Sequence, residues 1–183
     1  AQDLAYSKTT DGGVTWGAAV VIDTAVTGWV YVSVWYDRWT PGNTTGNKIH
    51  IAAADTAADD IYYTYLDVSS DTLKGSVVAA VLGSTTLTVL ADGPPSITVG
   101  AGGDIFVCGN FASTAGGKVG KSNDGAGAVW TDVTPSGWSS VAIDQIQLLP
   151  LSTDSDIIAI RADTANNDID SRVYDEVGNT WDG

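Results

Sequence analysis

An internal repeat constrains the fold of this chain more than any other feature of its sequence. The segment ADTAADDIYYTYLDVSSDTL (54–73) aligns without gaps on ADTANNDIDSRVYDEVGNTW (162–181), at an offset of 108 residues. Midway between them, KSNDGAGAVW (121–130) keeps the same spacing of six residues from an aspartate to a large apolar residue. The offset therefore spans two periods of about 54 residues, and such a period indicates a repeated structural unit.

Each repeat has the pattern of several short β-strands. Val, Ile, Thr, Tyr and Trp cluster between Gly, Asp, Asn, Ser and Pro, and helical periodicity is nearly absent. We expect four consecutive strands over 29–37, 48–54, 60–67 and 75–82. Four strands in a repeat of about 50 residues are typical of a β-propeller blade. The sequence therefore predicts an all-β fold, a β-propeller of four-stranded antiparallel blades; a twisted two-sheet sandwich is the alternative, because strand spacing alone does not separate the two.

The repeat divides residues 1–183 of this single propeller segment into four parts. We expect the outer hairpin of a blade in 1–23, full blades in 24–82 and 83–134, and three strands of an incomplete blade in 135–183. About three to four blades are then present, a partial ring that further blades of the same protein or other copies of the chain must complete. The absence of methionine and of a signal peptide leads us to expect a processed product or an excerpt of a longer protein.

Composition excludes several classes of function. The net charge is −14 with only eight Lys and Arg residues, so the surface repels phosphate backbones and a nucleic-acid partner is not expected. All acidic residues except Glu176 are aspartates, which favour turns. No apolar run approaches the roughly 20 residues of a membrane span. The single cysteine, Cys108, excludes an internal disulfide and has the surroundings of a buried strand residue.

One turn resembles a known family motif. TTDGGVTW (9–16) is similar to the Asp-box, the S/T-x-D-x-G-x-T-W turn (BNR repeat) of sialidase-like β-propellers, at Thr9, Asp11, Gly13, Thr15 and Trp16. Degenerate copies lie at 122–130 and 173–181, and a worn copy lies at 65–73. The first degenerate copy keeps Ser122, Asp124, Gly127 and Trp130, and the second keeps Asp175, Gly178 and Trp181. The worn copy keeps Asp67.

These turns are expected to be structural. The aspartate can accept hydrogen bonds from N–H groups of its own hairpin, the glycine can supply a positive φ, and the tryptophan can pack across the turn. The resemblance implies the same, because the Asp-box is a folding element remote from the active site in this family.

The resemblance also implies that ligand-binding groups gather on the opposite face, on the loops between second and third strands and at the starts of the innermost strands. That face would hold a candidate binding surface: Trp29, Trp138, Asp59, Asp60, Asn166, Asn167 and Asp168. Exposed aromatic rings beside Asp and Asn suit the stacking and hydrogen bonding of a sugar. For the two tryptophans themselves, core packing between blades is the favoured interpretation and ligand stacking is the alternative.

Catalytic residues are not evident. A sialidase-like enzyme needs three converging arginines and a Tyr nucleophile beside a Glu, whereas Arg38, Arg161 and Arg172 fall on different strands and faces. The single histidine, His50, is expected to be a packed strand residue rather than a zinc ligand. No cofactor is expected, although Asp168 with Asp170, or Asp154 with Asp156, could bind Ca²⁺; turn formation explains the same aspartates.

The sequence thus favours a non-catalytic Asp-box β-propeller module of a secreted, cell-surface or virion-associated protein, used for structural display and for binding a glycan or a protein surface. The alternative is a sialidase-like glycoside hydrolase whose catalytic residues lie partly outside this segment. A third hypothesis is a structural subunit that is not a stable monomer, because open blades expose apolar faces.

Overall fold

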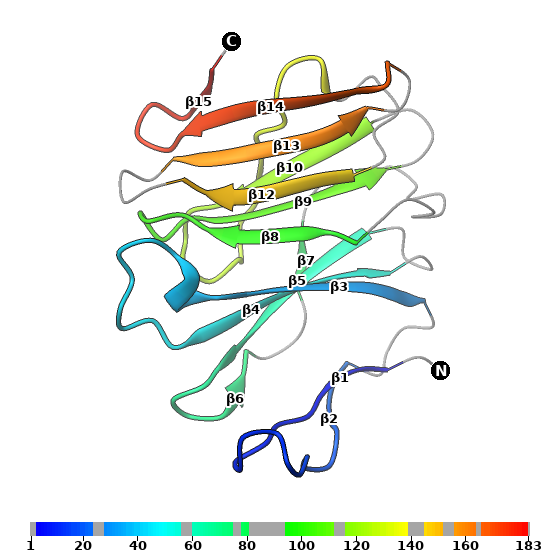
Figure 1. Cartoon of the computed structure of the whole chain (residues 1–183), viewed down its shortest axis with the longest axis vertical. Coiled ribbons are helices and arrows are strands. Elements are labelled where there is room, and N and C mark those ends of the chain that lie inside the picture. Colours follow the sequence, from blue (N-terminus) through cyan, green and yellow to red (C-terminus); the bar gives the residue numbers. More distant parts are fainter. Residues whose placement is uncertain are drawn as a thin grey trace.

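The computed structural model describes residues 3–23, 28–55, 60–74, 78–80, 94–111, 116–138, 145–151, 156–163 and 166–182. These residues form antiparallel sheets that stack one on the next along the chain (Figure 1). The described residues contain no α-helix, and η1 (Asp37–Trp39) is a single 3₁₀ turn. The predictions of an all-β fold and of four-stranded antiparallel sheets are confirmed.

The chain begins with a two-stranded N-terminal hairpin and continues with the first sheet. The hairpin consists of β1 (Leu4–Tyr6) and β2 (Val20–Asp23). The first sheet consists of β3 (Trp29–Tyr36), β4 (Lys48–Asp55), β5 (Asp60–Asp67), β6 (Thr72–Leu73) and β7 (Val78–Ala80). Both short strands pair with β5; β7 lies within the fourth strand expected over 75–82, and β6 precedes that range.

Two four-stranded sheets follow, each in the order of its strands along the chain. The second sheet consists of β8 (Ser96–Val99), β9 (Ile105–Phe111), β10 (Gly116–Ser122) and β11 (Thr131–Asp132). The third sheet consists of β12 (Gln145–Pro150), β13 (Ile157–Asp163), β14 (Asp168–Asp175) and β15 (Thr180–Trp181). The prediction of three strands in the last part was wrong, because the residues after the final turn pair with β14 as a short fourth strand.

The core lies between the sheets, and β9 illustrates how the sequence builds it. Side chains alternate between the two faces of a strand. Ile105 and Val107 pack against the first sheet, whereas Phe106 and Cys108 pack against the third. All four are fully buried, which explains why β9 is an unbroken apolar run rather than an alternating one. Burial raises the pKa of the Cys108 thiol to about 12, so this cysteine is an inert packing residue.

The sheets at the two ends of the stack have exposed apolar faces. On β3 the valines at 30, 32 and 34 are 45%, 51% and 46% exposed, and on the third sheet Leu149 and Ile169 are 46% and 74% exposed. Leu148, on the inward face of β12, is buried, whereas Trp29 at the start of β3 is buried against Leu4 of the N-terminal hairpin and Ala53. Each end therefore retains the surface that a further sheet of the same kind would cover.

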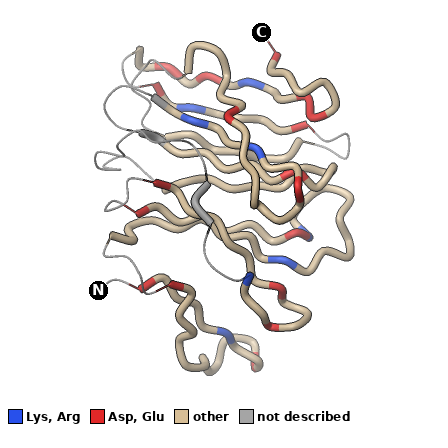
Figure 2. Tube along the Cα trace, turned by 180° about the vertical axis from the view of Figure 1, so that it is seen from behind, with Lys and Arg blue, Asp and Glu red and all other residues tan. Residues whose placement is uncertain are grey.

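The stack has two opposite edges, which carry different kinds of connection (Figure 1). The loop side is the edge at which β4, β9 and β13 end and β3, β8 and β12 begin. The turn side is the other edge, which carries η1 and the turns that precede β6, β11 and β15. Acidic residues lie along both edges and basic residues are few and scattered (Figure 2).

Candidate functional site

The loop side of the third sheet carries a cluster of polar side chains around Arg161. This arginine lies two residues before the end of β13 and is only 8% exposed. Its Nε donates a hydrogen bond of 2.8 Å to Asp170 Oδ2, its Nη2 also donates to Asp170, and Nη2 lies 3.5 Å from Asp163 Oδ2. The guanidinium carbon lies 5.1 Å from the ring centre of Trp138, in cation–π contact.

One hydrogen-bond donor of the cluster is not used by the described residues. Arg161 Nη1 is buried and has no hydrogen-bond partner among the described residues. Two carboxylates surround one guanidinium, so the cluster as a whole is negative and does not suit an anion. The buried N–H can instead donate to a hydroxyl group, and the neighbouring carboxylate oxygens can accept a hydrogen bond from that hydroxyl.

The turn after β13 extends this cluster to the surface. Asn166 donates to Asp163 from its backbone N–H at 3.2 Å and from its amide Nδ2 at 2.9 Å. Asn167 has a φ of +52°, and Asp168 is exposed and accepts the N–H of Ile169 at 2.8 Å. Three of the predicted binding residues therefore lie beside Arg161, which the prediction had considered only as a catalytic arginine.

The equivalent turn of the first sheet brings two aspartates together. Asp55 and Asp60 are register partners at the ends of β4 and β5. Asp55 is fully buried, and Asp60 is half-buried and accepts the N–H of Ile61 at 2.8 Å. Burial raises the pKa of Asp60 to about 6, which outweighs that hydrogen bond. Asp59 lies outside the described residues.

Both predicted tryptophans are core residues rather than exposed platforms. Trp29 is 7% exposed and packs edge-on against Tyr62, with ring centres 5.3 Å apart. Trp138 is 1% exposed and lies between Arg161 and Trp181. The alternative of exposed rings was wrong, because the sheets close over them, and the favoured interpretation of core packing describes both side chains. Ligand binding by the remaining predicted residues stays a prediction.

The turn side holds the aspartate turns, and their hydrogen bonds are local. Asp124 accepts backbone N–H groups of residues 126–129 at 2.6–2.9 Å and the Ser122 hydroxyl at 2.9 Å. Burial works to raise the pKa of Asp124, but these hydrogen bonds outweigh it and lower the pKa to about 2. Asp11 accepts from the backbone and hydroxyl of Thr15 and from the Thr9 hydroxyl, and these bonds lower its pKa.

The worn copies of the turn keep the same pattern. Asp67 accepts the N–H groups of Ser69 and Ser70, and Asp175 accepts those of Val177 and Gly178. Positive φ is supplied by Gly13 and Gly127 in the turns of Asp11 and Asp124, by Asp71 in the turn of Asp67, and by Asn179 rather than Gly178 in the last turn. All of these aspartates are occupied by their own hairpins.

The tryptophans of these turns differ in burial. Trp130 is 8% exposed and packs edge-on against Tyr63 of the preceding sheet, with ring centres 5.5 Å apart. Trp181 is half-buried and donates through Nε1 to the carbonyl of Val133. Trp16 is 64% exposed, against the expectation that it packs. Each buried tryptophan therefore contacts the sheet before its own, and the described residues include no sheet before the hairpin.

Lysines also join successive sheets on the turn side. Lys121 Nζ donates to Asn179 Oδ1 at 2.7 Å, and Lys8 Nζ donates to Asp71. In both pairs the lysine precedes the aspartate of one turn by three residues, and its acceptor follows the aspartate of the next turn by four. We call this pairing the lysine latch. Sequence spacing alone could have revealed it.

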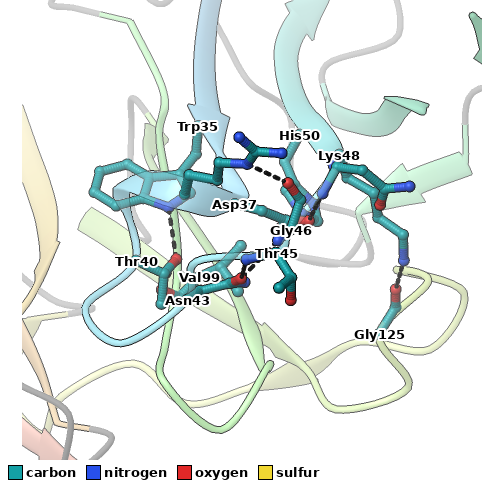
Figure 3. Close-up of polar contacts among 12 residues, drawn as sticks. Trp35, Asp37, Thr40, Asn43, Thr45, Gly46, Lys48, His50, Val99 and Gly125 are labelled. Atoms are coloured by element: carbon teal, nitrogen blue, oxygen red, sulfur yellow. Dashed lines mark hydrogen bonds and ion pairs between the residues drawn. The ribbon is translucent and has the colours of Figure 1, made fainter. Parts of the chain in front are cut away.

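A buried hydrogen-bonded chain joins η1, β4 and β5 of the first sheet, and the sequence did not reveal it; Figure 3 shows the part formed by Asp37 and His50. His50 Nε2 lies 2.7 Å from Asp37 Oδ1, and His50 Nδ1 lies 2.7 Å from the hydroxyl of Tyr63. Burial works to raise the pKa of Asp37, but the bonds from His50 and the Lys48 N–H lower it overall. His50 is 2% exposed, which confirms the prediction of a packed strand residue.

The potential catalytic residues do not form one site. Arg38 donates to the Gly46 carbonyl at 3.0 Å on the turn side, whereas Arg161 lies on the loop side and Arg172 within β14. Glu176 is 8% exposed on the turn side, where burial, reinforced by the charge of Asp104, raises its pKa to about 7. Its Oε1 has no hydrogen-bond partner among the described residues and fills the space left by Gly100, 1.5 Å from where a Cβ would be.

In the described part of the chain, no three His, Cys, Asp or Glu side chains are grouped to hold a metal ion. Asp170 is bound to Arg161, and Asp154 lies outside the described residues, so calcium remains only a prediction. No helix of the described residues is long and apolar enough to span a membrane.

The stack of four-stranded antiparallel sheets defines the class of this protein as a β-propeller, present here as a partial ring. No protein-family model matches the sequence, and no curated protein matches it significantly. Among solved structures, a mutant of the NanB sialidase from Streptococcus pneumoniae aligns with 97% of this chain at a TM-score of 0.56 and 12% identity. The chain is therefore similar in fold to a sialidase, and the sandwich alternative is not supported.

Two further structures share the fold. A thermostable family-43 glycoside hydrolase aligns with 98% of this chain at a TM-score of 0.51 and 13% identity. A Hadza microbial sialidase also aligns with 98% at a TM-score of 0.50 and 13% identity. This chain spans 27% of the NanB chain, 70% of the family-43 chain and 35% of the Hadza sialidase chain.

Proposed function

We propose that this chain is part of a non-catalytic β-propeller module that binds a glycan or a protein surface on its loop side. The observation that carries the proposal is the Arg161 cluster, in which a buried guanidinium is held by Asp163 and Asp170 and keeps Nη1 without a partner among the described residues. An arginine held in this way is pre-organised to donate a hydrogen bond without losing further side-chain freedom.

The chemistry of the cluster favours a glycan ligand. Exposed amide and carboxylate groups at Asn166, Asn167 and Asp168 add acceptors and donors around the buried arginine. Hydroxyl groups both donate and accept, so a sugar can satisfy such a mixed set. The propeller fold of two sialidases and a family-43 glycoside hydrolase supports the same ligand class.

A glycan array with the labelled protein tests this proposal. The double change Asn166→Ala and Asp168→Ala removes exposed groups and is expected to reduce glycan binding about tenfold, the cost of one or two hydrogen bonds. Thr44→Ala, an exposed change on the turn side, is the matched control and is expected to bind normally. Binding that survives unchanged in the double variant and in Arg161→Lys would overturn the loop-side assignment.

We extend the proposal to location and assembly. A glycan-binding module meets its ligands outside the cell, so we propose that the protein is secreted, displayed at a cell surface or part of a virion. The apolar faces at both ends of the stack support completion of the ring by further blades or by other copies of the chain. Light scattering that finds a well-folded monomer of residues 1–183 would count against the need for completion.

A second candidate function is glycoside hydrolysis, with part of the catalytic machinery outside this segment. One observation favours it: Asp60, with a pKa of about 6, is the register partner of Asp55 on the loop side. A carboxyl group with a raised pKa beside a second carboxylate is the acid–base arrangement of glycosidases. Hydrolysis of a fluorogenic sialoside that is lost in Asp60→Asn, and in Arg161→Lys or Arg172→Lys, would favour this candidate over the first.

A further inference from the structure

A cavity of about 220 Å³ lies between the second and third sheets on the turn side. The second sheet contributes Lys121 and Thr131 with their neighbours Asn123 and Val133, and the third sheet contributes Tyr174 and Asn179. Lys121 and Tyr174 are 7% and 2% exposed and form the floor. The exposed side chains of Asn123, Thr131 and Asn179 surround the mouth, so the cavity opens to solvent.

The floor carries no unbalanced charge. Lys121 Nζ lies 2.8 Å from Asp104 Oδ2 and donates to Asn179 Oδ1 at 2.7 Å. The ammonium also lies 5.7 Å and 5.2 Å from the ring centres of Phe106 and Tyr174. Burial alone would lower the pKa of Lys121, but its contacts with Asp104 raise it, so the ion pair persists at neutral pH. The positive charge is already compensated and is not available to an anionic ligand.

The mouth holds hydrogen-bonding groups that are not used within the protein. Asn179 Oδ1 accepts from Lys121 and, at 3.3 Å, from the Tyr174 hydroxyl, which leaves its Nδ2 pointing elsewhere. The side chains of Asn123 and Thr131 have no hydrogen-bond partner in the described part of the chain. The side chain of Val133 makes one wall apolar. The backbone of Val133 is held in place by the hydrogen bond from Trp181 Nε1 to its carbonyl. Amides and a hydroxyl around an apolar wall match the alternating polar and apolar surface of a sugar ring.

A second cavity in the same molecule provides an internal comparison. The space beside the Lys8–Asp71 latch has about 400 Å³ and is lined largely by apolar side chains, among them Val34, Ile51 and Leu66. Both cavities adjoin a lysine latch between successive sheets, so the latch does not by itself require a polar lining. The polar lining of the smaller cavity is a property of its own residues.

We propose that the cavity bounded by Lys121, Tyr174 and Asn179 is a binding site for a single neutral sugar unit. Its volume is below the roughly 300 Å³ at which pockets for larger ligands begin, so one pyranose ring fits better than an oligosaccharide. The open mouth admits the terminal unit of a glycan. The site is independent of the loop-side surface, which lies at the opposite edge of the sheets.

Amide-detected NMR titration of the protein with methyl glycosides tests the site. The probes are methyl β-D-galactoside, methyl β-D-glucoside and methyl N-acetyl-β-D-glucosaminide, each up to about 20 mM, because ligands of this size are expected to bind with a Kd near 1 mM. At least one probe is expected to shift the side-chain amide signals of Asn123 and Asn179 in a saturable way. No saturable shift with any of the three would overturn the proposal.

Variants keep the test specific to this cavity. Thr131→Trp fills the mouth and is expected to weaken the saturable binding about tenfold. Thr180→Trp is the matched control, because Thr180 is the exposed first residue of β15 as Thr131 is of β11, and it is expected to bind normally. If Thr131→Trp does not fold, Asn123→Ala removes only an exposed amide and is expected to weaken binding several-fold.

Two results would contradict the site directly. Equal affinity in the wild type, Thr131→Trp and Asn123→Ala would place the sugar elsewhere. Tighter binding of sialic acid than of all three neutral glycosides at the same amide signals would refute the neutral ligand class. Failure of the loop-side glycan array would not affect either result, since its variants do not touch the cavity.

Discussion

Replacing Glu176 with glutamine is expected to remove a pH-dependent loss of stability. The folded protein raises the pKa of Glu176 from the usual 4.5 to about 7, because the carboxyl group is buried against Gly100 and lies near the charge of Asp104. The nearby ammonium of Lys121 opposes this rise but does not cancel it. The folded state therefore binds this proton more tightly than the unfolded state does.

The sign and size of the effect follow from linkage. Below the unfolded pKa of 4.5 the carboxyl is protonated in both states, and the full stability is present. As the pH rises through about 7, the folded protein must hold a buried carboxylate, and stability is lost. A tenfold change in proton affinity is worth about 1.4 kcal/mol, so the loss amounts to at most about 3 kcal/mol between pH 4.5 and pH 8.

Urea unfolding followed by tryptophan fluorescence measures this loss. The wild type and Glu176→Gln are compared at several pH values from about 4.5 to 8, and the difference between them isolates Glu176 from other carboxyl groups such as Asp60. The free energy of unfolding of the variant, relative to that of the wild type, is expected to increase steadily as the pH rises. A difference that stays constant within about 0.5 kcal/mol over this range would refute the assignment of a raised pKa to Glu176.

Four further substitutions test the packing of the turn side, each by urea unfolding. Trp130→Ala is expected to cost about 3–5 kcal/mol because the ring is buried, whereas Trp16→Ala should cost less than about 1 kcal/mol; similar costs would contradict the different burial of the two turns. His50→Leu removes the bonds of its ring to Asp37 Oδ1 and to the Tyr63 hydroxyl and should cost about 2–4 kcal/mol; a neutral result would show that the hydrogen-bonded chain does not stabilise the fold. Gly127→Ala places a Cβ 2.1 Å from the Tyr63 ring at a φ of +65° and should cost at least about 2 kcal/mol; a stable variant would disprove this close contact.

The repeat allowed the architecture to be predicted, because a period is a property of the sequence itself. The divisions expected at 24–82, 83–134 and 135–183 each contain one sheet. The last strand was missed because only two residues, Thr180 and Trp181, pair with β14. Such short pairing leaves no run of alternating residues to recognise.

The contents of the sites were harder to predict, because they depend on contacts between repeats. Core packing of Trp138 between blades was expected beside a possible role in ligand stacking, but not that Arg161, 23 residues later, would cover its ring. The sequence placed Glu176 only within the degenerate turn at 173–181, yet its carboxyl group lies against Gly100, which follows β8 of the neighbouring sheet. Residue type and spacing indicate which strand holds a side chain but not which side chain of another sheet lies over it.

The lysine latch has a consequence for how such a protein can lengthen. A repeat that carries Lys121 before its turn offers a donor to the repeat that follows, and the acceptor at Asn179 faces the repeat that precedes it. Donor and acceptor lie on different units, because the unit with Lys121 has Ala128 at the acceptor position and the unit with Asp71 has Thr64 at the donor position. An acceptor unit and the donor unit after it therefore form a pair that can join further pairs in one direction only. A gene segment that duplicates such a pair in frame would bring both halves of the contact with it, and the added pair could dock without any new interface having to evolve.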